Sequence, residues 1–336
     1  MGIPKKQFTV YCLGHFWIDF SCALLLFTHL REGDQWLLCV LLYNFCAFAL
    51  QMPIGLLADL FSRNSCVAAF GCGLAALGWF FAGSPIPAAV LSGLGNGCFH
   101  VGAGIDVLKA KKSAALGVFI SPGAFGIYLG TLLGKGAVLA GWPVIIGLVC
   151  FGILPVLLDL RQRGGLHSGN PPVSLTLNSR WALVCLVIVV VLRSYVGMMQ
   201  NFDWKKGSLA LAAVCMLVFG KAAGGFLGDA VGMRKAALFS LGLSAPLFLF
   251  GEMPLAGLAA IFLFNMTMPV TLWGVSRLLP EAKGFSFGLL SFGLFLGFLP
   301  TYASVSVPLP GAWICSLGAV VSLALLLVGL RKGGVR

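Results

Sequence analysis

The chain has 336 residues, of which 59% are hydrophobic and 10% are charged, and its mean hydropathy is +1.00. A soluble domain carries about 25% charged residues, so this composition excludes a soluble globular fold and predicts an integral membrane protein. The net charge of +12 does not indicate nucleic-acid binding, because the basic residues lie singly or in small clusters between apolar segments.

A helix needs about 20 apolar residues to cross the hydrocarbon core of a bilayer, and charges and Gly/Pro/Ser clusters divide this chain into twelve such segments. The first six are predicted at 8–29, 36–58, 65–82, 86–108, 113–134 and 137–159. The second six are predicted at 181–202, 207–228, 234–251, 254–275, 284–305 and 312–330. The apolar segment after residue 6 is too long and holds too many polar groups for a cleaved signal peptide, so we interpret it as the first span.

The longest connection between predicted spans covers residues 160–180 and is rich in Gly, Pro, Ser and Asn. This composition is typical of a flexible linker between domains. We therefore expect an N-terminal six-helix half at 1–159 and a C-terminal six-helix half at 181–336.

A short pattern repeats at an offset of about half the chain. Residues 55–59 end the predicted second span and residues 225–229 end the predicted eighth, 170 positions later, with glycine first and aspartate last in both. A weaker match pairs Asn96 in the fourth span with Asn265 in the tenth, at an offset of 169. The repeat predicts an all-α fold of two pseudo-symmetric halves, which is typical of secondary transporters whose solute site lies between the halves.

The basic residues between the spans predict the orientation of the chain. With a cytoplasmic N-terminus, four fall in the outer loops: Arg31, Lys135, Lys205 and Lys206. Sixteen fall on the cytoplasmic side: Lys5, Lys6, Arg63, Lys109, Lys111, Lys112, Arg161, Arg163, Arg180, Arg234, Lys235, Arg277, Lys283, Arg331, Lys332 and Arg336. This asymmetry follows the positive-inside rule and predicts that both termini are cytoplasmic.

The two repeated segments resemble the loop motif of the major facilitator superfamily, Gly-x-Leu-x-Asp followed by Gly and basic residues. The sequence GLLADLFSRN occupies 55–64 and GGFLGDAVGMRK occupies 224–235. The second copy matches better, since Leu60 and Ser62 stand where the family has Arg and Gly in the first. The resemblance implies the twelve-helix major facilitator fold, with spans one, four, seven and ten lining the solute cavity.

Two finer resemblances concern the mode of transport. The glycines of the fifth span resemble the glycine-spaced motif of the superfamily's antiporters, with Thr131 in place of its proline and Lys135 in place of a glycine. Residues 15–19 (HFWID), 93–100 (GLGNGCFH) and 278–280 (LLP) resemble the fosmidomycin-resistance family of efflux proteins, although Val101 and Gly102 replace the Pro-Glu that usually follows. The glycines of that fifth-span motif are Gly117, Gly126, Gly130, Gly134 and Gly136.

Five ionisable residues fall inside predicted spans, where a charge is costly unless it meets a partner or a water-filled cavity. His15 and Asp19 lie one helical turn apart and share a face of the first span. We hypothesise that Asp19 exchanges a proton and that His15 tunes it, while Arg193 and Lys221 present positive charge to an anionic or polar solute. His100, Asn96 and Asn265 complete the predicted solute and proton pathway.

Structural roles are the alternatives for the same residues. Asp19 and Arg193 would form an ion pair that joins the halves. His15 and His100 would be hydrogen-bonded packing residues. Lys221 would extend its amine to the membrane interface.

The repeated segments also predict gate residues at the cytoplasmic mouth. Gly55 and Asp59 share a helix face, so the glycine admits a neighbouring helix while the carboxylate accepts hydrogen bonds from a helix N-terminus or pairs with Arg63. Asp106 is expected to bridge to Arg63. Gly225, Asp229, Arg234 and Lys235 would serve the other half.

Other functional classes find little support in the sequence. No HExxH, GxSxG or phosphate-loop motif and no paired catalytic carboxylates appear, so we expect no enzyme and no cofactor. The four histidines and 11 cysteines show no ligand spacing, which predicts no metal site. A channel would need a continuous polar pore, and a non-transporting receptor or scaffold is a further alternative.

These observations together predict a secondary transporter of a small molecule that uses alternating access. Proton-coupled efflux of a drug or metabolite is the leading interpretation, and proton-coupled uptake of a small anion is the alternative. We expect a monomer in the lipid bilayer of a bacterial inner membrane, with the proton as coupling ion and no nucleic-acid partner.

Overall fold

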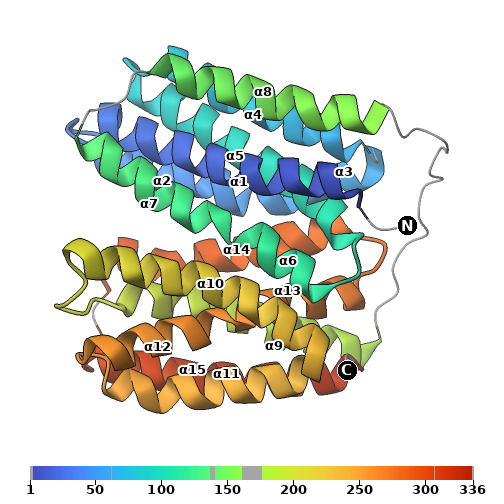
Figure 1. The fold of residues 1–336 in the computed structure, drawn as a ribbon, viewed down its shortest axis with the longest axis vertical. Coiled ribbons are helices and arrows are strands. Elements are labelled where there is room, and N and C mark those ends of the chain that lie inside the picture. The colour runs from blue at the N-terminus through green and yellow to red at the C-terminus, as the bar shows by residue number, and fades with distance from the viewer. Residues whose placement is uncertain (1–2, 62, 137–140, 161–175, 306, 335–336) are drawn as a thin grey trace. The chain divides into compact units, whose positions relative to one another are not determined.

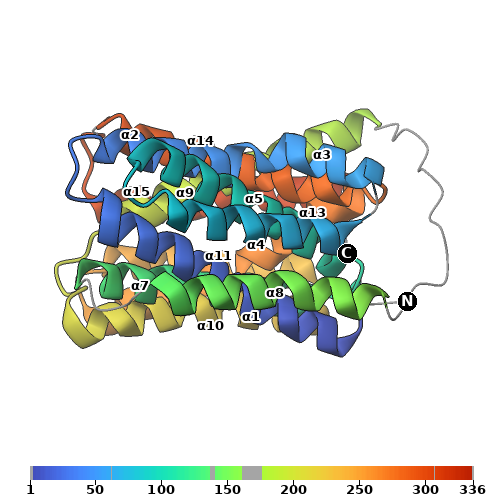
Figure 2. The ribbon, with the colours of Figure 1, turned by 90° about the horizontal axis from the view of Figure 1, so that it is seen from above.

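The structure is a computed structural model that describes residues 3–61, 63–136, 141–160, 176–305 and 307–334. Within these ranges the regular structure is entirely helical. Ten segments are long and apolar enough to cross a membrane. The third and ninth predicted spans correspond to two 17-residue helices, α4 (Asn64–Phe80) and α11 (Met233–Leu249). The helices are drawn in Figures 1 and 2. The all-α fold with twelve predicted spans is confirmed, and the ends of the helices fall within four residues of the predicted ends.

Two kinds of segment form the first six spans. Helices α4, α5 (Pro85–Leu108) and α8 (Gly141–Leu160) are single helices. The others are composite: α1 (Lys5–Leu25) with the π-helical turn η1 (Leu26–Leu30), α2 (Trp36–Asn44) with η2 (Phe45–Ala49) and α3 (Gln51–Phe61), and α6 (Ser113–Ile120) with α7 (Pro122–Lys135).

Five of the last six spans are single helices. The single helices are α9 (Leu177–Met199), α10 (Gly207–Val231), α11, α14 (Lys283–Tyr302) and α15 (Gly311–Lys332). The tenth span consists of α12 (Pro254–Asn265) and α13 (Thr267–Leu278). The predicted linker at 160–180 lies mostly outside the described residues, and α9 begins within it, at Leu177.

Proline explains two of the breaks inside spans. Pro122 lacks the N–H that would pair with the Val118 carbonyl, and α6 ends two residues before it, at Ile120. Pro269 likewise leaves the Asn265 carbonyl without its helical donor, and α12 ends at Asn265. Both breaks therefore follow from the chemistry of the backbone.

The described chain forms two compact units. Unit 1 comprises the described residues within Met1–Ala110, Pro122–Pro171 and Glu281–Phe292, and unit 2 comprises those within Lys111–Ser121, Pro172–Pro280 and Gly293–Arg336. Each unit therefore contains a segment from the other half of the sequence: α6 belongs to unit 2, and the first part of α14 belongs to unit 1.

In unit 1, α5 packs on α4 and α1 packs on α7 and α8. Glycine permits the α4–α5 contact, because a Cβ at Gly71 would lie 2.6 Å from the Gly95 carbonyl oxygen, and a Cβ at Gly95 would lie 2.6 Å from the Gly71 carbonyl oxygen. Small residues of this kind let membrane helices approach at backbone distance. In unit 2, α15 packs on α9 and α11, and α10 packs on α6 and α12.

Candidate functional site

The centre of unit 1 contains a cluster of buried ionisable groups contributed by α1 and α5. Asp19 is 6% exposed, and one of its carboxylate oxygens, Oδ2, lies 3.2 Å from Nε2 of His15. The other oxygen, Oδ1, accepts a 2.6 Å hydrogen bond from the Asn96 carboxamide and lies 3.8 Å from Nε2 of His100. The two imidazole rings meet edge to face with their centroids 4.3 Å apart. Four predicted pathway residues are therefore brought together around one carboxylate.

A glycine on α7 makes room for this cluster. A Cβ at Gly123 would overlap both the Asp19 carboxylate and the His15 imidazole. Gly123 carries no distinguishing signal in the sequence, because the small residues of the fifth span are interpretable only once their neighbours are known. The backbone of α7 therefore packs directly against the charged groups.

A stripe of polar residues along α1 leads away from the cluster. Gln7, Tyr11, His15 and Asp19 recur at intervals of four residues, so they share one face of the helix. This spacing was a signal from which Gln7 and Tyr11 could have been found. Gln7 donates a 3.1 Å hydrogen bond to the Tyr11 hydroxyl.

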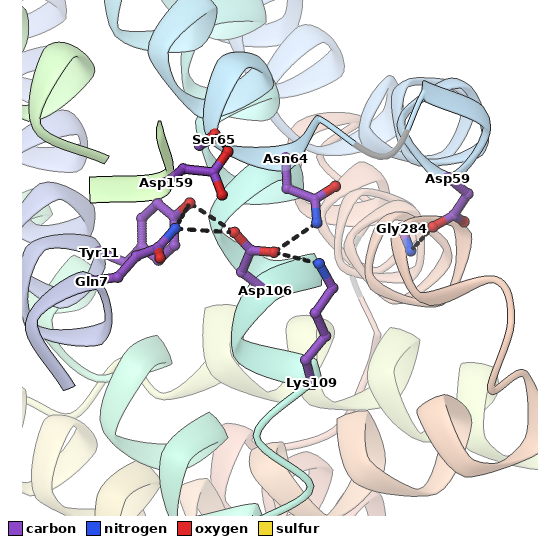
Figure 3. A network of polar contacts seen from close by, with 9 residues as sticks. All are labelled: Gln7, Tyr11, Asp59, Asn64, Ser65, Asp106, Lys109, Asp159 and Gly284. Carbon is purple, nitrogen blue, oxygen red and sulfur yellow. Dashed lines mark hydrogen bonds and ion pairs between the residues drawn. The ribbon is translucent and has the colours of Figure 1, made fainter. Parts of the chain in front are cut away.

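At the end of this stripe, Tyr11 donates a 2.9 Å hydrogen bond to Asp106 of α5 (Figure 3). The same carboxylate accepts a 2.6 Å hydrogen bond from Asn64 and pairs with Lys109 at 2.7 Å. The predicted bridge from Asp106 to Arg63 is wrong. The Asp106 carboxylate interacts with Tyr11, Asn64 and Lys109, while Arg63 is exposed at the start of α4.

The centre of unit 2 contains a buried cation. Arg193 of α9 is 6% exposed, and its Nη2 donates a 2.7 Å hydrogen bond to the Thr267 hydroxyl at the start of α13. Its Nε and Nη1, which carry three of the five guanidinium N–H groups, find no hydrogen-bond partner among the described residues. Asp19 and Arg193 belong to different units, and each has polar partners within its own unit.

The two remaining predicted pathway residues hydrogen-bond to backbone carbonyls. Lys221 of α10 donates to the Ile120 carbonyl of α6 at 3.4 Å. Asn265 donates to the Ile261 carbonyl of its own helix at 2.8 Å. Asn265 therefore differs from its counterpart Asn96, which bonds to a charged group.

Each repeated aspartate accepts hydrogen bonds from the first turn of another helix. Asp59 accepts a 2.8 Å hydrogen bond from the backbone N–H of Gly284 at the start of α14 (Figure 3). It also accepts a 2.9 Å hydrogen bond from the backbone N–H of Phe285. Asp229 accepts from Ser113 N–H and Ala114 N–H on α6, at 2.9 and 3.0 Å. A carboxylate is stabilised at a helix N-terminus by unpaired N–H groups and by the helix dipole. Of the two contacts predicted for Asp59, the structure shows the helix N-terminus.

Glycines permit these contacts at backbone distance. A Cβ at Gly55 would overlap the Gly284 carbonyl, and a Cβ at Gly225 would lie 2.5 Å from the Ser113 carbonyl oxygen. The two contacts are related by the sequence repeat, since span two meets span eleven and span eight meets span five. We call them the Asp59 latch and the Asp229 latch. Both connect a residue of 1–159 to a residue of 181–336.

The predicted basic gate residues of the second repeat lie apart from the Asp229 carboxylate oxygens. Arg234 donates a 3.3 Å hydrogen bond to the Leu330 carbonyl in the last turn of α15. Lys235 is exposed. A cation at a helix C-terminus is favourable, so Arg234 stabilises the end of α15.

No family model and no curated protein matches this sequence. Among solved structures, a variant of the E. coli fucose:proton symporter FucP aligns with a TM-score of 0.70 at 15% identity, covering 95% of this chain and 97% of that chain. The human organic anion transporter MFSD10 (TETRAN) aligns with a TM-score of 0.71 at 17% identity, covering 97% and 99%. A bacterial homologue of the iron transporter ferroportin, in an outward-facing state, aligns with a TM-score of 0.65 at 15% identity, covering 97% and 98%.

These alignments extend over nearly the whole of each chain, and together with the membrane-length helices they define a polytopic membrane fold. FucP is described as a Major Facilitator Superfamily (MFS) transporter. This chain has the major facilitator fold.

Proposed function

We propose that this chain is a secondary active transporter that exports a small drug or metabolite by alternating access, in exchange for protons. One observation carries the proposal: each unit holds a buried ionisable group on the first span of its half, hydrogen-bonded to the fourth span of that half. These groups are Asp19, bonded to Asn96, and Arg193, bonded to Thr267. Ionisable groups at membrane depth are costly, so they usually mark an ion or solute pathway.

The two groups have complementary roles in the proposal. Asp19 takes up and releases the proton, with His15 and His100 as its neighbours. Arg193 binds the negative or polar part of the solute through its open N–H groups. Binding of a proton and binding of the solute then influence each other, which is the coupling that transport against a gradient requires.

The two latches supply the gating contacts. They connect the two halves of the sequence through hydrogen bonds to helix N-termini, and such contacts can be broken and remade without unfolding a helix. We propose that they close the cytoplasmic end of the transporter in one state and open in the other. Both termini are proposed to lie in the cytoplasm of a bacterium, with the chain as a monomer in the inner membrane.

Export is favoured by the resemblance of residues 15–19 and 93–100 to the fosmidomycin-resistance family and by the glycines of the fifth span. Uptake of a small anion is the second candidate, and the open N–H groups of Arg193 favour it. Two of the solved structures with a similar fold are a fucose:proton symporter and an organic anion transporter. The first is compatible with the proposal that this chain couples transport to protons, and the second with the proposal that its solute is an anion. A receptor or scaffold would not require a buried ionisable group in each half, so these groups favour transport.

The test is a toxicity panel in an efflux-deficient bacterial host, with phosphonates among the compounds. Wild type is compared with Asp19→Asn, and with Asp34→Asn as a control that removes an exposed carboxylate of unit 1. We expect wild type and Asp34→Asn to confer resistance to at least one compound and Asp19→Asn to confer none, at equal membrane levels. Hypersensitivity would indicate uptake, and no difference across the panel would leave export unsupported.

A further inference from the structure

We infer that His15, Asp19 and His100 form a binding site for one divalent first-row transition-metal ion. The candidate ligand atoms, one from each residue, all lie within 4.8 Å of one another. In a tetrahedral site with bonds of 2.0–2.2 Å, neighbouring ligand atoms lie about 3.4 Å apart. Nε2 of His15 lies 3.2 Å from Oδ2 of Asp19, and Nε2 of His100 lies 3.8 Å from its Oδ1, so each imidazole already stands within 0.4 Å of that spacing from one oxygen of the carboxylate. Small side-chain rotations would therefore complete the coordination.

The hydrogen bond on the far side of His100 orients this ring as a ligand. Its Nδ1 lies 2.8 Å from the Asn96 carbonyl oxygen, and a carbonyl only accepts, so Nδ1 carries a proton. In the neutral ring, Nε2 then presents a lone pair toward Asp19. Metal-binding histidines characteristically donate their second ring nitrogen to a carbonyl or carboxylate in this way.

When His100 is neutral, one cation can bind both it and Asp19. Nε2 of neutral His100 and Oδ1 of Asp19 are both acceptors, 3.8 Å apart, and a cation that both can bind relieves their repulsion. The Asn96 carboxamide supports the arrangement from the side, because it donates to the same Asp19 oxygen at 2.6 Å. Asn96 thus orients His100 with its backbone carbonyl and Asp19 with its side chain.

The ligand types select the class of metal. Two imidazoles and one carboxylate suit Zn²⁺, Fe²⁺, Co²⁺ or Mn²⁺, whereas Mg²⁺ and Ca²⁺ prefer oxygen ligands throughout. Three protein ligands leave further positions for water or a solute group, as in metal sites that exchange ligands. The inference goes beyond the proposed proton exchange, because a bound metal would occupy the lone pairs that the proton uses.

The experiment uses the purified full-length protein in nanodiscs, with Co²⁺ as a spectroscopic probe. We expect one Co²⁺ per chain, with visible absorption typical of mixed nitrogen and oxygen ligands, displaced by Zn²⁺ and unaffected by Mg²⁺ or Ca²⁺. His15→Gln, His100→Gln and Asp19→Asn should each weaken binding at least about 10–100-fold, the loss seen even for outer-shell partners of a metal. His29→Gln removes an imidazole from η1, outside the cluster, and should leave binding unchanged.

Folding of each variant is checked by thermal denaturation without metal. The three cluster variants introduce glutamine or asparagine, because a polar side chain at each position is less disruptive to folding than an apolar one. Two results would overturn the inference: no saturable Co²⁺ binding by wild type, or equal binding by the three cluster variants. Proton-driven transport is measured separately in vesicles containing a chelator. If only the metal site is wrong, proton-driven transport will still be observed although Co²⁺ does not bind. If only the proposed function is wrong, Co²⁺ will still bind although no proton-driven transport is observed.

Discussion

At the scale of single residues, the most informative side chain is Arg193. Its buried guanidinium has one hydroxyl partner and two nitrogens without partners among the described residues. Each buried polar group that lacks a hydrogen bond costs about 1–3 kcal/mol. A residue that lowers stability in this way is typical of a functional site, where binding requires groups that are held ready for a ligand.

Replacement of Arg193 by methionine should therefore separate stability from function. We expect Arg193→Met to raise the free energy of unfolding by about 1–3 kcal/mol, because the unpaired donors are removed. Thr267 keeps its 2.8 Å hydrogen bond to the Phe264 carbonyl, so the change leaves no new unsatisfied group at that hydroxyl. Transport should be abolished. Thermal denaturation in detergent and solute flux in vesicles measure the two effects.

The control is Arg193→Lys, which keeps the charge but loses the planar set of donors. It should reduce transport strongly without the gain in stability. If Arg193→Met instead lowered Tm by several degrees and preserved flux, Arg193 would be a structural cation and not a solute ligand.

The sequence predicted part of the unit 1 cluster for a simple reason. His15 and Asp19 are related by helical spacing alone, so their contact at 3.2 Å could be anticipated. The approach of His100 depends on how α5 packs against α1, which no local pattern contains. The predicted absence of a metal cluster rested on spacing along the sequence, and the structure brings three ligand-type residues together despite it.

At the scale of elements, apolar length predicted every span, but the structure adds breaks within them. The breaks after Ile120 and Asn265 could have been inferred from Pro122 and Pro269, and the break after Ala49 from Pro53, whereas the π-helical turn η1 has no proline within or shortly after it. The helix N-terminus as the partner of Asp59 was predictable from chemistry, because a carboxylate beside a close-packing glycine favours such a contact. Which helix supplies it was not predictable.

The Asp229 latch yields a prediction about the cycle. Asp229→Asn removes the charge and leaves one carbonyl acceptor for two backbone donors, at a cost of about 1.5–3 kcal/mol for a charge-assisted hydrogen bond. We expect transport cycling to fall while the protein still reaches the membrane. Flux per molecule in vesicles measures the effect, and loss of membrane expression would count against a gating role.

The glycine of the same latch has a matched control. Gly225→Ala would place a Cβ 2.5 Å from the Ser113 carbonyl oxygen, whereas Gly242→Ala on α11 would meet no described atom within 4 Å. The first variant should reproduce the transport defect of Asp229→Asn, and the second should behave as wild type. Equal effects of the two alanines would show that the close approach of α10 and α6 is unimportant.

At the scale of the whole molecule, the two compact units do not coincide with the two halves expected from the repeat. Helix α6 comes from 1–159 and packs with α10 in unit 2, while the first part of α14 comes from 181–336 and packs with α3 in unit 1. The domain boundaries at 159 and 181 stay a prediction about the sequence repeat. The exchange of segments is a property of tertiary packing, which the repeat alone does not encode.

This exchange predicts how the chain behaves when it is divided within 161–175 and produced as two fragments. Each fragment alone would expose the glycine faces at Gly55 or Gly225 and leave Asp59 or Asp229 without its backbone donors. We therefore expect each fragment to be degraded when produced alone, and both to accumulate and co-purify through a single tag when produced together. Fragments carrying Gly55→Leu and Gly225→Leu should not co-purify, because the added side chains occupy the space of the opposing backbone. Independent accumulation of both fragments at wild-type levels would show instead that each half is stable without the segment exchanged by the other.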